Sequence, residues 1–296
     1  MASPRKTRLA TDVWRLVVGV SWLSLLCAAQ AFGQTEPKDA EGQTITAAQR
    51  WLHNFYQQQA ATYEFHFDEA KTKRLQFVER SIFHWKQDND WSGGLFVWTH
   101  QGRPEVLGCI LASPSNEGKR SVGHEFHTLA LQSLPRAKTV SGTWQPKTGI
   151  KLTPMEEAAP PVATAALRLT QLRKLAREFS VTMKFQDQPW ELRLLPQPIY
   201  RYAAPDAGVI DGGLFAYVWT RGTDPEMLLM LECRDEVPMP RWYYSLLRFT
   251  TRPLQVKWND REVWNSPGTG NSVRGDSQEP YVTFNAGQVS VPADQP

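Results

Sequence analysis

An internal duplication constrains the fold of this chain more than any other feature of its sequence. Residues 97–107 (VWTHQGRPEVL) and 218–228 (VWTRGTDPEML) share Val, Trp, Thr, Pro, Glu and Leu at matching positions. A GGLF segment precedes each of them, at 93–96 and at 212–215. Such self-similarity is the sequence signature of a repeated structural unit, so we expect two copies of one unit.

Further matches extend the two copies in both directions. Upstream, 75–85 (LQFVERSIFHW) aligns without a gap to 192–202 (LRLLPQPIYRY), and downstream Trp144 and Trp264 close the copies. The predicted organisation is a signal peptide at 1–31, a linker at 32–45, a first repeat lobe at 46–150, a hinge at 151–162, a second repeat lobe at 163–264 and a polar tail at 265–296. We expect the hinge to be exposed, and the tail to be mostly loose apart from one short strand at 281–284.

The apolar pattern inside each copy changes from a helical to an extended period. Apolar residues recur at helical spacing over 166–179 in the second copy, and 48–56 have the corresponding pattern in the first. Over 63–67, Tyr and Phe alternate with Glu and His, as in a half-buried strand. We therefore predict an α+β fold of two tandem copies, each a helix followed by an antiparallel β-meander.

The N-terminus has the three parts of a secretory signal. Basic residues precede an apolar run at 16–26, and small residues follow at Ala29 and Ala31. We expect cleavage after Ala31 and export to the periplasm or the extracellular space. A retained anchor is the alternative, although the run is shorter than the ~20 apolar residues of a spanning helix.

The charge balance argues against a nucleic-acid partner. The chain has 33 basic and 30 acidic residues, and loss of the signal peptide removes four basic residues and one acidic residue, which leaves equal numbers. A neutral chain has no summed field that attracts phosphate backbones or anionic membrane surfaces. We expect a protein, peptide or glycan partner, and membrane contact only through the signal peptide.

Two cysteines remain after removal of the signal peptide, which contains Cys27. Disulfides persist in exported proteins, so Cys109 and Cys233 could form a bridge. Two buried free thiols are the alternative, because sequence does not supply the Cα spacing that a disulfide requires.

The histidines are confined to one copy. All six lie between His53 and His127. Because imidazole is a common metal ligand, one hypothesis is a metal or His-dependent catalytic site formed by His100, His124 and His127. However, the segment around His124 and His127 reads as a strand, in which a spacing of three directs side chains to opposite faces. We predict no cofactor and assign no catalytic residue.

Aromatic residues are the main candidates for a binding surface. The chain has 12 tryptophans, and aromatic platforms bind sugars and peptides, although aromatics also fill the cores of β-proteins. The candidate binding residues combine aromatic positions of both copies with two arginines: Trp85, Trp98, Tyr202, Trp219, Arg201 and Arg221.

Two carboxylate pairs are weaker candidates for acid–base chemistry. Asp224 with Glu226 and Asp206 with Asp211 lie in predicted turns, where Asp is favoured by its hydrogen bonds to the backbone. The sequence contains no GxSxG, Walker, HExxH or CxxC motif, which argues against several hydrolase classes.

Four motifs together resemble an uncharacterised family of exported bacterial proteins. They are LRLLPQPIYRY, DGGLF, TDPE and REVW (261–264), and all belong to the second copy. The first copy departs from this pattern, with VERSIFHW and GRPE at the corresponding places. The resemblance implies export but no activity and no site residue, because this family has no assigned function.

We therefore expect an exported, non-enzymatic tandem module that binds a partner or contributes to envelope assembly. A metal- or His-dependent hydrolase with its site in the first copy is the alternative.

Overall fold

The structure is a computed structural model that describes residues 45–269 and 276–292. The predicted signal peptide and all but the last residue of the predicted linker lie outside the described residues. Everything described belongs to one compact unit. No helix in these described ranges is both long enough and apolar enough to cross a membrane.

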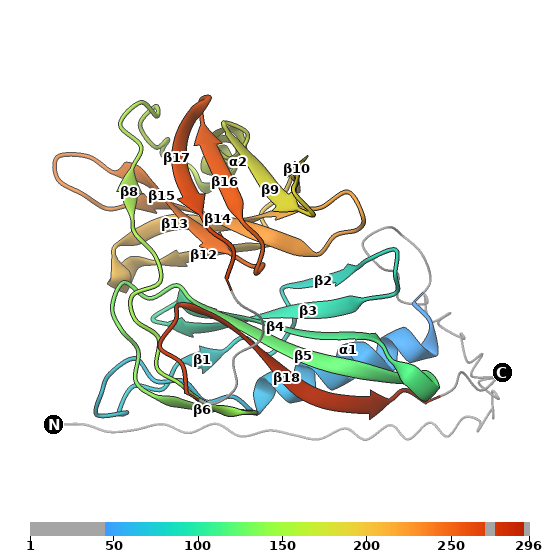
Figure 1. The fold of residues 1–296 in the computed structure, drawn as a ribbon. Helices are drawn as coiled ribbons and strands as arrows, with labels where there is room; N and C mark the ends of the chain where they lie inside the picture. Colours follow the sequence, from blue (N-terminus) through green and yellow to red (C-terminus); the bar gives the residue numbers. More distant parts are fainter. Residues whose placement is uncertain (1–44, 270–275, 293–296) are drawn as a thin grey trace, which may run out of the picture. The chain divides into compact units, whose positions relative to one another are not determined.

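The fold consists mostly of antiparallel β-sheet with two α-helices (Figure 1). Helix α1 spans Ala47–Ala61 and helix α2 spans Ala165–Ala176. The side chain of Thr46 accepts a hydrogen bond from the Gln49 amide and so caps α1, and Thr164 caps α2 in the same way. Both helices lie where the apolar periodicity predicts them.

The first sheet has six strands in the order β1-β3-β4-β5-β18, with β2 also paired to β3. The strands are β1 (Gln76–Phe77), β2 (Phe83–Lys86), β3 (Ser92–His100), β4 (Arg103–Pro114), β5 (Lys119–Thr128) and β18 (Tyr281–Ser290). A short 3₁₀ turn, η1 (Asn116–Gly118), joins β4 to β5.

The second sheet has the order β11-β13-β14-β15-β8, with β12 also paired to β13. The strands are β8 (Thr153–Pro154), β11 (Arg193–Leu194), β12 (Tyr200–Ala204), β13 (Val209–Val218), β14 (Pro225–Arg234) and β15 (Arg241–Arg248), with η2 (Pro205–Ala207) after β12. In both sheets, two short strands pair with one long strand, which continues into a three-stranded meander.

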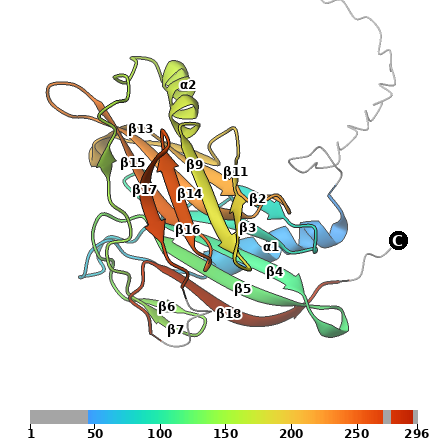
Figure 2. The same cartoon turned by 45° about the horizontal axis from the view of Figure 1, so that its top comes forward.

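Two smaller sheets complete the described structure. A four-stranded sheet contains, in spatial order, β10 (Gln188–Glu191), β9 (Phe179–Phe185), β16 (Leu254–Trp258) and β17 (Arg261–Ser266). Figure 2 shows β9, β16 and β17 side by side in front of the second sheet. A two-stranded sheet contains β6 (Ala137–Thr139) and β7 (Gly142–Trp144).

Three apolar cores hold these elements together. The first sheet packs its outer face on α1 through Tyr56 and Phe96, and the second packs its outer face on α2 and the four-stranded sheet through Leu172 and Phe215. The alternate residues of the same strands form a third, inter-sheet core. Because both faces are covered, the central strands lack the polar alternation of half-exposed strands.

The β-hairpin turns dock reciprocally across the two sheets. A Cβ atom on Gly102, between β3 and β4, would lie 2.9 Å from the carbonyl oxygen of Ala203 in β12. A Cβ atom on Gly222, between β13 and β14, would lie 2.3 Å from the carbonyl oxygen of Lys86 in β2. The Thr223 amide donates to the same Lys86 oxygen at 3.0 Å. Each turn thus needs a glycine because the other sheet's backbone approaches so closely.

A buried ion cluster crosses the inter-sheet core. Arg103 Nε donates to Glu232 Oε1 at 2.9 Å, and Arg103 Nη1 lies 3.2 Å from Glu105. The Tyr202 hydroxyl donates to the same Glu232 oxygen at 2.8 Å. Burial opposes the charge on Arg103, but the two carboxylates outweigh it and raise the pKa of Arg103. Burial raises the pKa of Glu105 to about 7, against the opposing effect of Arg103.

Three segments differ from their prediction. Residues 63–67 bury Tyr63 and Phe65 in the α1 core, as the alternation predicts, but they form only a single antiparallel bridge, between His66 and Arg74, and no named strand. The predicted hinge at 151–162 is exposed or half-buried at every residue except Met155, but it is anchored rather than free, since β8 pairs with β15 and Met155 is 2% exposed. The tail prediction is also wrong in its extent: β18 runs for ten residues along β5. The open edge of β5 supplies backbone partners for β18, and local sequence cannot show such an edge.

Candidate functional site

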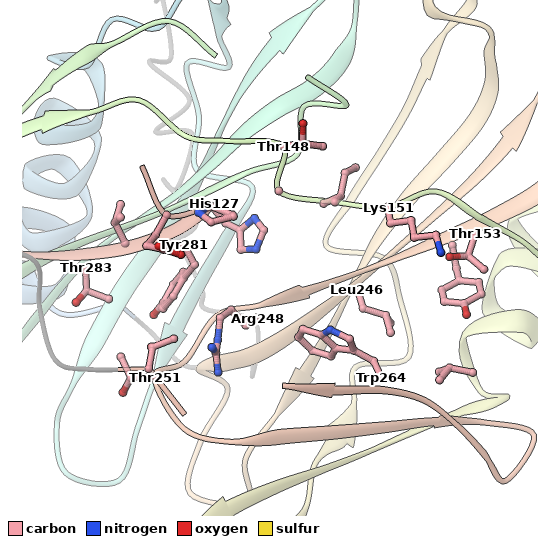
Figure 3. A pocket seen from close by; sticks show the side chains of 18 residues that line it. His127, Thr148, Lys151, Thr153, Leu246, Arg248, Thr251, Trp264, Tyr281 and Thr283 are labelled. Carbon is pink, nitrogen blue, oxygen red and sulfur yellow. The ribbon is translucent and has the colours of Figure 1, made fainter. Parts of the chain in front are cut away.

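A pocket of about 930 Å³ lies where the two sheets and the segment that connects them meet (Figure 3). The first sheet contributes His127 from β5 and Tyr281 from β18. The second sheet contributes Leu246 and Arg248 from β15. The walls are completed by residues 148–151 and Thr153 of the connecting segment, by Trp264 of β17 and by several further threonines. This volume is typical of a small-molecule site.

Arg248 is the buried cation of this pocket. Its residue is 8% exposed, and its guanidinium donates from Nε to the Thr250 carbonyl at 3.1 Å. Nη2 donates to the carbonyls of Arg252 and Pro267, at 3.0 and 2.8 Å. Burial lowers the pKa of Arg248, yet a guanidinium starts so high that it stays charged at neutral pH. None of the three bonds uses Nη1.

His127 supplies a neutral polar group to the same pocket, and Tyr281 lines it while its hydroxyl is buried beside Glu125. The His127 Nδ1 atom lies 2.7 Å from the Thr128 carbonyl, which can only accept, so Nδ1 carries the proton and Nε2 is left as an acceptor. Burial lowers the pKa of His127 to about 4, so the ring is uncharged at neutral pH. Burial raises the pKa of Tyr281 well above its usual range, so its hydroxyl stays protonated.

A second pocket, of about 520 Å³, shares Tyr281 and Thr251 with the first. Besides Asp88, three carboxyl groups line it: Glu125 from β5 of the first sheet, Asp224 just before β14, and Glu226 within β14. Gln87 Nε2 donates to Asp224 at 2.8 Å, and Arg252 Nη1 donates to Glu226 at 3.0 Å. We call these three residues the carboxyl cluster.

The carboxyl cluster binds protons more tightly than isolated carboxylates do. Burial, and then the Glu226 charge, raise the pKa of Glu125 to about 8. Burial, followed by the charges of Glu226 and Glu125, raises the pKa of Asp224 well above its usual range. Burial also raises the pKa of Glu226, with Arg252 as the main opposing charge. The cluster therefore carries fewer negative charges at neutral pH than its three carboxyl groups would suggest.

The predicted aromatic binding surface is wrong for three of its members. Trp85 and Tyr202 lie in the inter-sheet core and Trp98 lies in the α1 core, with exposed fractions of 3%, 7% and 1%. The Trp85 ring nitrogen donates to the Cys109 sulfur at 3.3 Å. These rings fill the layers between covered sheet faces and so cannot form a surface platform.

The other three predicted binding residues are divided between two places. Trp219 and Arg221 line the second pocket, with the guanidinium carbon of Arg221 4.8 Å from the centre of the Trp219 ring. Arg252 also lies over this ring, at 5.0 Å. Arg201 is elsewhere, because it pairs with Asp211 at 2.7 Å in the second sheet. Arg201 therefore has a structural partner and belongs to neither pocket.

The histidine hypothesis is wrong in its geometry. His124 faces the α1 core, where its Nδ1 lies 2.6 Å from the Tyr63 hydroxyl, whereas His127 points to the opposite face of β5. His100 stacks on Phe67 with 4.0 Å between ring centres. Within the described ranges, no group of three or more His, Cys, Asp or Glu side chains could hold a metal ion. Alternation along β5 separates His124 from His127, and His100 lies at the end of another strand, β3.

The hypothesis of a Cys109–Cys233 bridge is also wrong for this structure. Both residues are buried free thiols. Cys109 belongs to the inter-sheet core, whereas Cys233 belongs to the outer core of the second sheet. The two side chains therefore lie in different layers, out of reach of a disulfide.

Sequence reasoning missed Arg248 and Glu125. A signal for Arg248 exists, because it is the one charged residue of the otherwise apolar SLLRF segment (245–249), a context in which a charge must find partners. Glu125 lies between His124 and Phe126 in a strand whose two faces are both covered. The sequence predicts Asp224 and Glu226 as a weak acid–base pair in a turn, but it does not predict that Glu125 joins them across the sheets.

Comparisons with known proteins add no assignment. No family model matches the chain, and searches of curated proteins and of solved structures found no match either. The functional conclusions therefore depend on the geometry of the two pockets.

Proposed function

We propose that this protein is an exported, non-enzymatic binding module that seats a ligand in the larger pocket. One observation carries the proposal: polar side chains from both sheets, His127 from the first and Arg248 from the second, converge on one concave pocket that the connecting segment also lines. Pockets that combine a few convergent polar groups with apolar walls are the usual location of ligand sites. The apolar wall here includes Leu246 and Trp264.

The proposal includes a duplicated scaffold. The matched sequence segments fall on matched elements, since GGLF lies in β3 and in β13 and the GRPE and TDPE segments lead into β4 and β14. The reciprocal docking of the two hairpin turns supports the same origin. Where two copies meet, a pocket can differ from the equivalent place on the other copy. One specific binding site can therefore evolve on a repeated scaffold.

Export is proposed on the strength of the N-terminal pattern alone. N-terminal sequencing of the protein from fractionated cells tests it. We expect the exported form to begin at Phe32. A chain that stays in the cytoplasm with its N-terminus intact would contradict export without bearing on the pocket.

A pocket-filling variant tests the binding function. Thr283 lines the pocket from β18, so Thr283→Trp is expected to fill part of it, and Thr182→Trp on β9, outside this pocket, is a matched control. We expect compounds that raise the melting temperature of the wild type to leave that of Thr283→Trp unchanged and still to stabilise the control. Equal stabilisation of all three chains would contradict a ligand site in this pocket.

The His-dependent hydrolase is not proposed, because the three candidate rings lie in separate environments.

A further inference from the structure

Two arginines in the described part of the chain are almost fully buried, and their partners differ. Arg103, 2% exposed, contacts the carboxylates of Glu105 and Glu232. Arg248, 8% exposed, contacts three backbone carbonyls, and within the described ranges no carboxylate pairs with it. Carbonyl dipoles solvate a guanidinium but do not neutralise it, so the Arg248 charge remains uncompensated inside the pocket.

One nitrogen of the Arg248 guanidinium is left available for a ligand. Its carbonyl bonds occupy Nε and Nη2, and these bonds hold the guanidinium in place while Nη1 takes part in none of them. A guanidinium held in this way is pre-organised for an oxyanion and loses little rotamer freedom on binding. In the view of Figure 3, Arg248 lies between Tyr281 and Trp264.

The remaining charges and donors of the pocket favour the same sign of ligand. Lys151 adds a second cation and Glu279 is the one acidic residue among the lining residues; both are exposed, so Arg248 is the buried charge of the pocket. Hydroxyl groups that can donate to an anion are supplied by four threonines and one tyrosine: Thr148, Thr153, Thr251, Thr283 and Tyr244. The pocket therefore has an excess of positive charge and of donors.

The size and the apolar wall indicate more than an inorganic ion. A pocket of about 930 Å³ is far larger than a phosphate or sulfate, and the Trp264 ring and the Leu246 side chain offer apolar contact beside Arg248. We propose that this pocket binds an organic anion, a molecule with one carboxylate or other oxyanion on Arg248 and an aromatic or aliphatic body against Trp264. This inference rests on the proposed function and names its ligand class.

Matched probes test the charge preference. Binding of 2-naphthoate and of its uncharged methyl ester is measured by isothermal titration calorimetry with the purified full-length protein, with naphthalene-2-sulfonate and inorganic phosphate as further arms. We expect 2-naphthoate to bind at least about tenfold more tightly than the ester, because only the carboxylate can form a hydrogen bond between two charged groups with Arg248. The sulfonate arm shows whether a carboxylate is required, and phosphate shows whether the organic body is required.

Substitutions assign the effect to the pocket. We expect Arg248→Gln to abolish the preference for 2-naphthoate over the ester, and Arg248→Lys to retain part of it. Loss of Arg248 also removes the contacts to three carbonyls. Lys151→Glu therefore provides a second variant, at an exposed position, and should lower the affinity for 2-naphthoate by about threefold or more. Arg221→Gln in the second pocket is the control and should leave the affinity unchanged.

The outcomes separate this inference from the proposed function. Equal affinity for 2-naphthoate and the ester, with both lost in Thr283→Trp, would overturn the anion preference and leave the binding pocket in place. Unchanged 2-naphthoate affinity in a folded Arg248→Gln protein would also overturn it. If neither naphthalene compound bound and no compound stabilised the wild type, both proposals would fail.

Discussion

Arg103 Nε lies 2.9 Å from Glu232 Oε1, and this ion pair joins β4 of the first sheet to β14 of the second inside an apolar layer. The Glu232 residue has no exposed surface. Buried charges are costly unless they are fully paired, so this contact fixes how the two sheets meet.

Removal of one partner from this pair should destabilise the whole molecule. Glu232→Leu leaves Arg103 with Glu105 as its remaining carboxylate and removes the acceptor of the Tyr202 hydroxyl. We expect a loss of about 3 kcal/mol in the free energy of unfolding, measured by urea titration. Glu157→Gln at the exposed Arg261–Glu157 pair is the control, with an expected change below about 1 kcal/mol. A similar small loss in both variants would refute a special role for the buried pair.

Gly222 should be intolerant of a side chain. The added Cβ atom of Gly222→Ala would lie 2.3 Å from the Lys86 carbonyl oxygen and 2.8 Å from the Gln87 Cα, which forces the turn away from β2. We expect about 2–3 kcal/mol of destabilisation by chemical denaturation. Gly118→Ala is the control: its φ is 68°, but no atom lies within 4 Å, so only the backbone strain of about 1 kcal/mol applies. Equal losses in the two variants would contradict a close approach of the sheets.

The carboxyl cluster should make stability fall as pH rises from 6.5 to 8. Glu125 has its pKa raised to about 8, so in this range the folded chain binds more protons than the unfolded chain. Its stabilising effect is complete below pH ~4.5 and is lost as the pH passes through about 8. Buried histidines with pKa near 4, such as His127, act in the opposite direction, but only below pH ~6.5.

Glu125→Gln isolates this effect. The other titratable residues that line the second pocket are Asp88, Asp224, Glu226, Arg221, Arg252 and Tyr281, and they remain in the variant. We expect the melting temperature of Glu125→Gln to depend less on pH between 6.5 and 8 than that of the wild type. Parallel curves for the two proteins would show that Glu125 ionises normally.

The two thiols should be unreactive until the protein unfolds. Burial raises the pKa of Cys109 well above its usual range and that of Cys233 to about 11, so neither forms a thiolate at neutral pH. With Cys27 replaced by Ser, we expect a thiol reagent such as dithionitrobenzoate to titrate two groups in urea and none in the native protein. A reductant should leave the melting temperature unchanged. A reductant-dependent stability would instead indicate a bridge.

Local pattern was sufficient for several elements of the fold. The helical periods over 166–179 and 48–56 lie where α2 and α1 form, although α2 ends at Ala176 and Phe179 begins β9. The GGLF segments fall within the long strands β3 and β13, and residues 221–224, with Gly222 and Asp224, lie in the turn before β14, which begins at Pro225. These features depend on interactions between near neighbours in the chain, which sequence records directly.

Only the tertiary structure decided which residues meet across the chain. Whether Trp98 lies on a surface or in a core, whether β18 finds the edge of β5, and whether Glu125 meets Asp224 all depend on how two sheets stack. The duplicated segments can be recognised from the sequence alone. The larger pocket, in contrast, forms at the junction of the sheets, where Arg248 and His127 come together from strands far apart in the chain. Burial and long-range pairing are properties of the packed layers, so no local pattern contains them.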